Sequence, residues 1–163
     1  MKKTVKKRRN QNKTDYSHRM GMLKSNAPRL VFRKTNKYLA AQYVQSKEAQ
    51  DKIVTGFNSK LLLKYGWPKE NIGGLKSTTA SYLFGYLISK KIQKEKLSKP
   101  IVDFGMIRMV KKSKVHAFLK GIVDAGISIG VKEEYLPDKD RIEGKHLKNK
   151  VPVSEIKSKI DNL

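Results

Sequence analysis

Residues 71–78 (NIGGLKST) place glycines, a lysine and a serine directly before an apolar repeat, as the phosphate-binding loops of nucleotide hydrolases do. The spacing differs from that of a Walker motif, because Leu75 stands before Lys76 where the motif requires glycine. We therefore expect no nucleotide hydrolysis here. A helix that begins after this segment would still present backbone N–H groups that can hold a single phosphate.

Carboxylates are the second set of residues that could do chemistry. Asp103, Phe104 and Gly105 spell the metal-binding tripeptide of protein kinases, but the other kinase motifs are missing, so we interpret them as a strand end followed by a turn. A metal-dependent nuclease would need several carboxylates that converge at strand ends. Asp51, Asp103 and Asp124 are the candidates, but Asp51 precedes its strand and Asp124 falls near a helix end. Their convergence is therefore not favoured.

Metal and thiol sites find little support in the sequence. The chain has no Cys, which excludes disulfides, cysteine zinc sites and thiol catalysis. Its histidines, His18, His116 and His146, are far apart, and we expect His116 on a helix, facing solvent or RNA. We expect no catalytic residue, no metal, no cofactor and no small-molecule substrate.

Positive charge is the strongest chemical signal in these 163 residues. Lys and Arg number 37 against 14 Asp and Glu, which makes the formal net charge +23. Solvated protein faces normally mix both signs, whereas no acid occurs between Asp15 and Glu48. The longest apolar run, residues 82–88, is far shorter than the roughly 20 residues that cross a bilayer. We therefore expect a nucleic-acid partner and no membrane partner.

The basic residues fall into three groups, interleaved with side chains that can stack on or hydrogen-bond to unpaired bases. The expected RNA contacts of the N-terminal segment are Lys6, Lys7, Arg8, Arg9, Lys13, Tyr16 and Arg19. Those of a predicted hairpin are Arg29, Arg33, Lys34, Asn36 and Lys37, and those of a later loop are Lys111, Lys112 and Lys114. We favour Arg33 and Asn36, beside the turn, for direct contact with bases.

The elements that must position these residues are predicted by apolar periodicity and by turn residues. Residues 1–26 form an extended basic arm, in which Thr14 or Asp15 can cap a short helix. Residues 27–148 form a single α/β domain, and residues 149–163 a loose tail. Within the domain we expect strands at 29–33, 38–44, 53–57, 100–105 and 127–129, and helices from Ser77 to Pro100 and over 115–123. The order β-β-β-α-β-α predicts a mixed sheet with helices packed on it and one parallel pair, an order that an RNase-H-like nuclease also has.

The chemistry-bearing residues stand in an order that resembles a known family. The pieces are KTDY at 13–16, Arg19, PRLV at 28–31, Arg33, Asn36, AQ at 41–42, GG at 73–74, Ala80, YL at 82–83, Gly85, Asp103, Gly105, KG at 120–121, DAG at 124–126, LP at 136–137, Arg141, Gly144 and His146. Together they resemble the 5S-rRNA-binding large-subunit ribosomal protein of the L-eighteen family, in its archaeal and eukaryotic branch. The short segment between Leu23 and Pro28 is similar to that of archaeal members.

The resemblance implies an RNase-H-like α/β fold without catalytic activity, in a cytoplasmic ribosome. It implies that the chain binds 5S rRNA and anchors it to the large rRNA in the central protuberance, beside neighbouring large-subunit ribosomal proteins. By position, the contacts on 5S rRNA would be Arg8, Arg9, Lys13, Tyr16, Arg19, Arg29, Arg33 and Asn36. The alternative that charge alone leaves open is an architectural protein that coats nucleic acids in general and binds duplex DNA as tightly as structured RNA.

Overall fold

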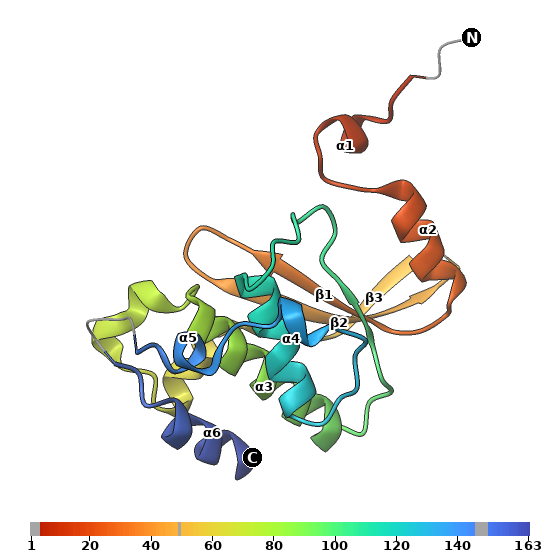
Figure 1. The fold of residues 1–163 in the computed structure, drawn as a ribbon. Helices are drawn as coiled ribbons and strands as arrows, with labels where there is room; N and C mark the ends of the chain where they lie inside the picture. The colour runs from red at the N-terminus through yellow and green to blue at the C-terminus, as the bar shows by residue number, and fades with distance from the viewer. Residues whose placement is uncertain (1–3, 49, 146–149) are drawn as a thin grey trace. The chain divides into compact units, whose positions relative to one another are not determined.

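A four-stranded mixed sheet runs through the computed structural model, which describes residues 4–48, 50–145 and 150–163 (Figure 1). The strands are β1 (Arg29–Lys34), β2 (Leu39–Lys47), β3 (Gln50–Asn58) and β4 (Ile101–Asp103), in the order β3-β2-β1-β4. β1 and β4 are parallel, with Arg29 opposite Ile101 and Val31 opposite Asp103. The predicted α/β class, the β-β-β-α-β-α order and the parallel pair are confirmed, while the RNase-H-like comparison stays a prediction.

The chain divides into two compact units. The first consists of residues 1–33, 41–56 and 99–108, and the second of residues 34–40, 57–98 and 109–163. The boundaries expected for the arm and for a single domain stay predictions.

Two short helices precede the sheet in the first unit. They are α1 (Lys7–Asn10), which has no buried residue, and α2 (Tyr16–Lys24). α2 begins where the sequence predicts, because the Asp15 carboxylate accepts hydrogen bonds from the amides of Ser17 (3.1 Å) and His18 (3.2 Å). The cap satisfies two backbone donors that a helix start leaves without partners.

Two helices, α3 (Thr78–Lys94) and α4 (Lys114–Asp124), pack against each other in the second unit (Figure 1). Ser77 caps α3 as predicted, and its hydroxyl accepts from the Ala80 amide at 3.1 Å. The two backbones touch at glycines: a Cβ added to Gly85 would lie 2.3 Å from the Phe118 carbonyl oxygen. The smaller helices of this unit are η1 (Ser59–Tyr65), η2 (Lys69–Gly74), η3 (Glu133–Tyr135) and α5 (Lys139–Glu143).

The structure corrects three expectations. Residues 127–129 contain no strand. The segment expected to be a loose tail forms α6 (Val153–Asp161), whose Ile156 and Ile160 are fully buried, because they occupy one helical face in contact with α3. His116 is 5% exposed and faces neither solvent nor a free surface, since its ring lies against Tyr135 with Ser113 Oγ 3.3 Å from Nδ1.

His146 lies outside the described residues. None of the helices over the described ranges is both long and apolar enough to span a bilayer.

Candidate nucleic-acid interface

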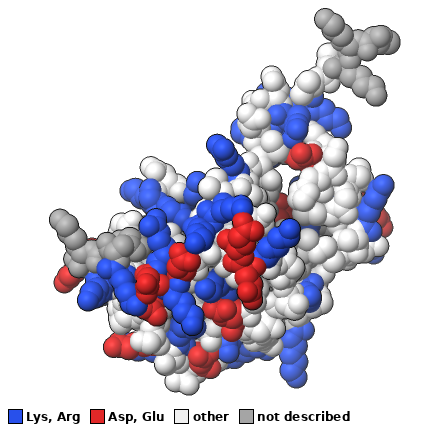
Figure 2. All heavy atoms as spheres, viewed as in Figure 1, with Lys and Arg blue, Asp and Glu red and all other residues white. Residues whose placement is uncertain are grey.

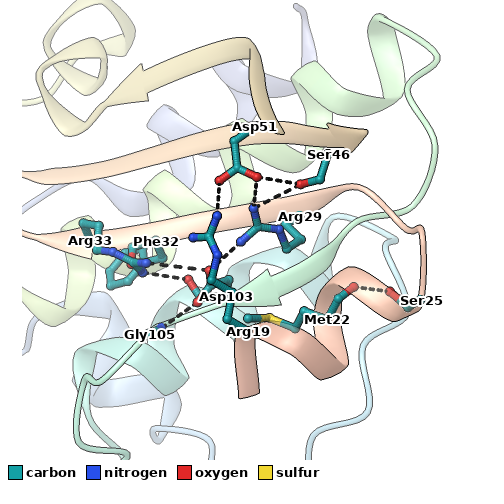
Figure 3. Close-up of polar contacts among 10 residues, drawn as sticks. All are labelled: Arg19, Met22, Ser25, Arg29, Phe32, Arg33, Ser46, Asp51, Asp103 and Gly105. Atoms are coloured by element: carbon teal, nitrogen blue, oxygen red, sulfur yellow. Dashed lines mark hydrogen bonds and ion pairs between the residues drawn. The ribbon is translucent and has the colours of Figure 1, made fainter. Parts of the chain in front are cut away.

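An ion-pair cluster around Arg29 organises the first unit (Figure 3). Arg29, on β1, is only 1% exposed, and its guanidinium donates to Asp51 on β3 at 2.7 Å and to Asp103 on β4 at 3.2 Å. The Ser46 hydroxyl accepts from the same guanidinium at 3.2 Å and donates to Asp51 at 2.7 Å. A buried guanidinium is tolerated when carboxylates surround it, so these contacts hold Arg29 inside the protein.

The placement of Arg29 corrects its expected role as an RNA contact. Its side chain is buried and already binds two carboxylates, so it offers no exposed donor to a phosphate. The Asp103 carboxylate also accepts a hydrogen bond from the Gly105 amide at 2.7 Å, at the strand end and turn that the sequence predicts. We therefore assign Arg29 to the internal structure.

The carboxylates considered for a nuclease have other partners. Asp51 and Asp103 do come together, but the Arg29 guanidinium binds both. Asp124 belongs to the second unit and accepts a hydrogen bond from the Tyr82 hydroxyl at 2.7 Å. Over the residues that the structure describes, no group of three His, Asp or Glu residues could hold a metal ion.

Arg19 and Arg33 flank this cluster with partly exposed side chains (Figure 3). Arg19, on α2, pairs with Asp51 at 2.8 Å and so ties the helix to β3. Arg33 donates to the carbonyl oxygens of Phe32 (2.7 Å) and Asp103 (3.1 Å). Each guanidinium is anchored at one side while about two fifths of the Arg19 side chain and nearly half of the Arg33 side chain remain exposed.

Asp51 is more acidic than an ordinary aspartate. Burial acts to raise its pKa, but hydrogen bonds from Ser46, Arg29 and Arg19 outweigh burial and lower the pKa from 3.8. Asp51 therefore stays ionised at neutral pH and keeps its pairs with Arg29 and Arg19.

The basic residues of the arm are exposed in the structure. Arg8 donates to the Thr14 hydroxyl at 3.0 Å, Arg9 pairs with Asp15 at 3.0 Å, and the Lys6 ammonium lies 4.5 Å from the Tyr16 ring centre. The five lysines and arginines between residues 6 and 13 that are expected to contact RNA are all exposed: Lys6, Lys7, Arg8, Arg9 and Lys13. Ion pairs and hydrogen bonds between exposed side chains are weak, so these cations remain available to bind a polyanion.

The hairpin turn between β1 and β2 presents a second exposed group. Lys34, Asn36 and Lys37 are exposed, and the turn is closed by the Thr35 amide and hydroxyl, which both donate to the Tyr38 carbonyl oxygen (2.9 and 2.7 Å). The Lys60 ammonium lies 4.7 Å from the Tyr38 ring centre. This arrangement gives Tyr38 a partner within the protein.

Two lysines at the turn are absent from the sequence-based set. Lys60 follows β3, and Lys76 precedes α3, yet Lys76 Nζ donates to the Asn36 carbonyl oxygen at 2.6 Å. Neither belongs to a local run of positive charge, so their sequence positions carry no signal of this proximity. Only the tertiary fold brings them to the hairpin.

The three expected lysines of the later loop differ in their partners. Lys111 and Lys112 are exposed and pair with Glu134 and Asp138. Lys114 is half-buried, and burial, followed by the charges of Lys34 and Lys76, lowers its pKa from 10.5. On the face drawn in Figure 2, acidic side chains lie among the widely spread basic ones. Positive charge without neighbouring acids occurs instead in the stretch between Asp15 and Glu48, which includes the hairpin turn.

Comparisons with known proteins match the chain to proteins of the large ribosomal subunit. Residues 2–101 match the model of the family described as "Ribosomal large subunit proteins 60S L5, and 50S L18". The chain is 43% identical to large ribosomal subunit protein uL18 of Korarchaeum cryptofilum over 141 residues, which cover 86% of the chain and 70% of that protein. It is 39% identical to the uL18 protein of Methanothermobacter thermautotrophicus over 86% of the chain and 71% of that protein. The uL18 protein of Thermofilum pendens is 38% identical over 88% of the chain and 71% of its own length.

Similarity of this extent shows more than a shared fold. The related proteins are, by name, proteins of the large ribosomal subunit, which are structural constituents and not enzymes. The matched region contains the arm, the hairpin and the Arg29 cluster. The chain therefore belongs to the family of large-subunit ribosomal proteins that includes 60S L5 and 50S L18, in its archaeal type.

Proposed function

We propose that this ribosomal protein binds 5S rRNA and anchors it to the large rRNA in the central protuberance. The observation that carries the proposal is the exposed, acid-poor positive charge of the arm and the hairpin turn, in a chain of this family. Phosphate contacts supply affinity without sequence preference, whereas contacts to unpaired bases supply selectivity.

In this proposal the two exposed groups have different tasks. Lys6, Lys7, Arg8, Arg9 and Lys13 bind phosphates, because they are exposed cations in a segment without a buried side chain. Arg19, Arg33 and Asn36 select the RNA, because the fold restrains them while leaving their side chains accessible. Large rRNA and the neighbouring proteins of the central protuberance occupy other surfaces.

Filter binding of the purified chain to 5S rRNA, to a tRNA and to duplex DNA across salt concentrations tests the proposal. We expect a preference for 5S rRNA that survives near-physiological salt, because base contacts do not depend on counterion release. Equal binding to all three, lost together as salt rises, would contradict the proposal and favour the general nucleic-acid-coating protein.

A substitution at the hairpin turn sharpens the test. Asn36→Ala removes an exposed side chain, and we expect it to lower the preference for 5S rRNA over tRNA without changing the salt dependence. Gln45→Ala, an exposed position on β2, is the matched control. Arg33→Ala is less informative, because it also removes hydrogen bonds to Phe32 and Asp103.

A further inference from the structure

Hydrogen bonds join three segments of the second unit: the hairpin turn, the start of α3 and the start of α4. Lys76 Nζ donates to the Asn36 carbonyl oxygen at 2.6 Å, which connects the turn to the residue just before the α3 cap. The Ser81 hydroxyl, in the first turns of α3, donates to the Lys114 carbonyl oxygen at 2.6 Å. The backbone around these lysines is therefore held in place by the fold.

Three lysines converge where these segments meet. Lys34 ends β1, Lys76 lies directly before the α3 cap, and Lys114 is the first residue of α4. Lys34 is exposed, while Lys76 and Lys114 are half-buried. Burial and, after it, the charges of Lys34 and Lys76 lower the pKa of Lys114 from 10.5, so both charges lie close enough to act on the Lys114 ammonium group.

No carboxylate balances this cluster. Within the described ranges, none of the three lysines forms an ion pair with Asp or Glu, and residues 1–3, 49 and 146–149 contain neither acid. Lys111 and Lys112, near in sequence to Lys114, each have an acidic partner. Partly buried like charges repel each other, so an anion at this position would remove an unfavourable interaction.

We propose that Lys34, Lys76 and Lys114 form a binding site for one backbone phosphate of rRNA, separate from the phosphate contacts of the arm. Lysine ammonium groups bind phosphate as compact point charges, and the N-terminal ends of α3 and α4 add partial positive charge of the same sign. The inference rests on the proposed function for its choice of RNA as the ligand. The hairpin turn beside the cluster, with exposed Asn36 and Lys37, extends the surface along an RNA strand.

Salt-dependent filter binding of full-length variants to 5S rRNA and to tRNA tests the site. The variant Lys76→Gln/Lys114→Gln removes two cations of the cluster, and Lys90→Gln/Lys145→Gln removes two cations that already have acidic partners and are not among the expected RNA contacts. For loss of one phosphate contact we expect the slope of log affinity against log salt to fall by about 0.7 to 0.9, and affinity at 0.1 M salt to fall roughly sixfold. The control pair should change the slope by much less.

Urea denaturation of the RNA-free variants separates binding from folding. We expect Lys114→Gln to be at least as stable as the unchanged chain, because it removes a repelled cation, and a role in folding alone would lower the stability. If the double variant fails to fold, Lys34→Gln replaces it, since that exposed side chain can be changed without disturbing buried contacts. Lys34→Gln must then lower the slope on its own.

The outcomes for the two proposals are distinguishable. Equal affinity of the unchanged chain for 5S rRNA and tRNA would contradict 5S recognition, while the slope difference on either RNA would still support the phosphate site. A preference for 5S rRNA with equal slopes for the cluster variant and the control would overturn the phosphate site alone. Binding of the unchanged chain and of the cluster variant to polyglutamate tests an acidic protein segment as the ligand. If the cluster variant lost polyglutamate binding while its RNA slope stayed unchanged, the phosphate site would also be overturned.

Discussion

Arg29 has the residue type and position of an RNA contact, but its surroundings give it another task. Its guanidinium binds Asp51 and Asp103, which come from different strands of the sheet. Removing one member of such a buried cluster leaves an uncompensated charge, which typically costs 3–5 kcal/mol. The exposed cations beside it, by contrast, have only weak intramolecular interactions to lose when they bind phosphate.

At this scale we predict how Asp51→Asn changes the dependence of stability on pH. The folded-state pKa of Asp51 lies below 3.8, so its ionised form stabilises the fold above that pH, and this contribution is lost as pH falls through the folded-state pKa. We expect the variant to lose about 1–2 kcal/mol at pH 7, less than a fully buried pair would lose, because Asp51 is partly exposed and Asp103 still pairs with Arg29. The variant should also show a shallower decline of stability in acid. Urea denaturation between pH 2.5 and 7 measures both effects.

Glu134→Gln is the control for this prediction. It breaks an exposed ion pair with Lys111, for which surface pairs give at most about 1 kcal/mol. An Asp51→Asn variant that matched this control at every pH would show that the Arg29 cluster does not stabilise the fold.

At the scale of the elements, two glycines allow the backbones of α3 and α4 to pack closely. A Cβ on Gly85 would lie 2.3 Å from the Phe118 carbonyl oxygen, and one on Gly121 would lie 2.1 Å from the Tyr82 carbonyl oxygen. Each helix thus places a glycine against the backbone of the other. The close approach also brings the Tyr82 hydroxyl to Asp124, and Lys157 of α6 donates to the same hydroxyl at 2.8 Å.

We expect Gly85→Ala to lower the free energy of unfolding by at least about 1–3 kcal/mol, because a methyl group there would force the backbones of the two helices apart. Gly21→Ala is the matched control, since a Cβ at this α2 position would meet nothing within 4 Å. It should raise stability by about 0.5–1 kcal/mol through helix propensity. Urea denaturation of both variants measures the contrast, and equal effects would refute close packing at Gly85.

Positive charge is distributed over the whole molecule in two forms. Much of it is mixed with acids, as on the face drawn in Figure 2, and pairs such as Lys112 with Asp138 neutralise each other. The remainder lies in segments with few or no acids, above all the arm and the hairpin turn. Because counterions are released by phosphates that a protein neutralises, the second form should dominate the salt dependence of RNA binding.

Deletion of residues 1–13, which contain seven Lys and Arg residues, should therefore lower affinity for every RNA and flatten the salt dependence. The slope should fall by about 0.7 to 0.9 for each phosphate contact that is lost. Filter binding to 5S rRNA and tRNA measures the effect. A full-length chain with the order of residues 2–13 scrambled keeps the charge and should keep the slope, whereas an unchanged slope after deletion would refute the role of the arm.

Much of the fold could be predicted because it depends on neighbouring residues. The spacing of apolar residues and the Ser77 cap predict α3, and the Asp15 cap predicts α2. Similarly, the short β4 follows from the apolar run after Pro100, and a helix between strands predicts one parallel pair. That β4 pairs with β1, and not with the β3 strand that precedes α3, is decided by the fold. The α6 helix was missed because its few apolar residues are stabilised by burial against α3, which a short charged segment does not reveal.

The sequence by itself determined most of the sheet and the two long helices, the excess of positive charge and the family, because periodicity, composition and ordered motifs are properties of the chain. Tertiary structure alone decided which basic residues are available to RNA. Arg29 is buried between Asp51 and Asp103, whereas Lys76 is brought to the hairpin turn from 40 residues away. The physical reason is that burial and electrostatic pairing depend on distances between residues far apart in sequence, which local patterns do not encode.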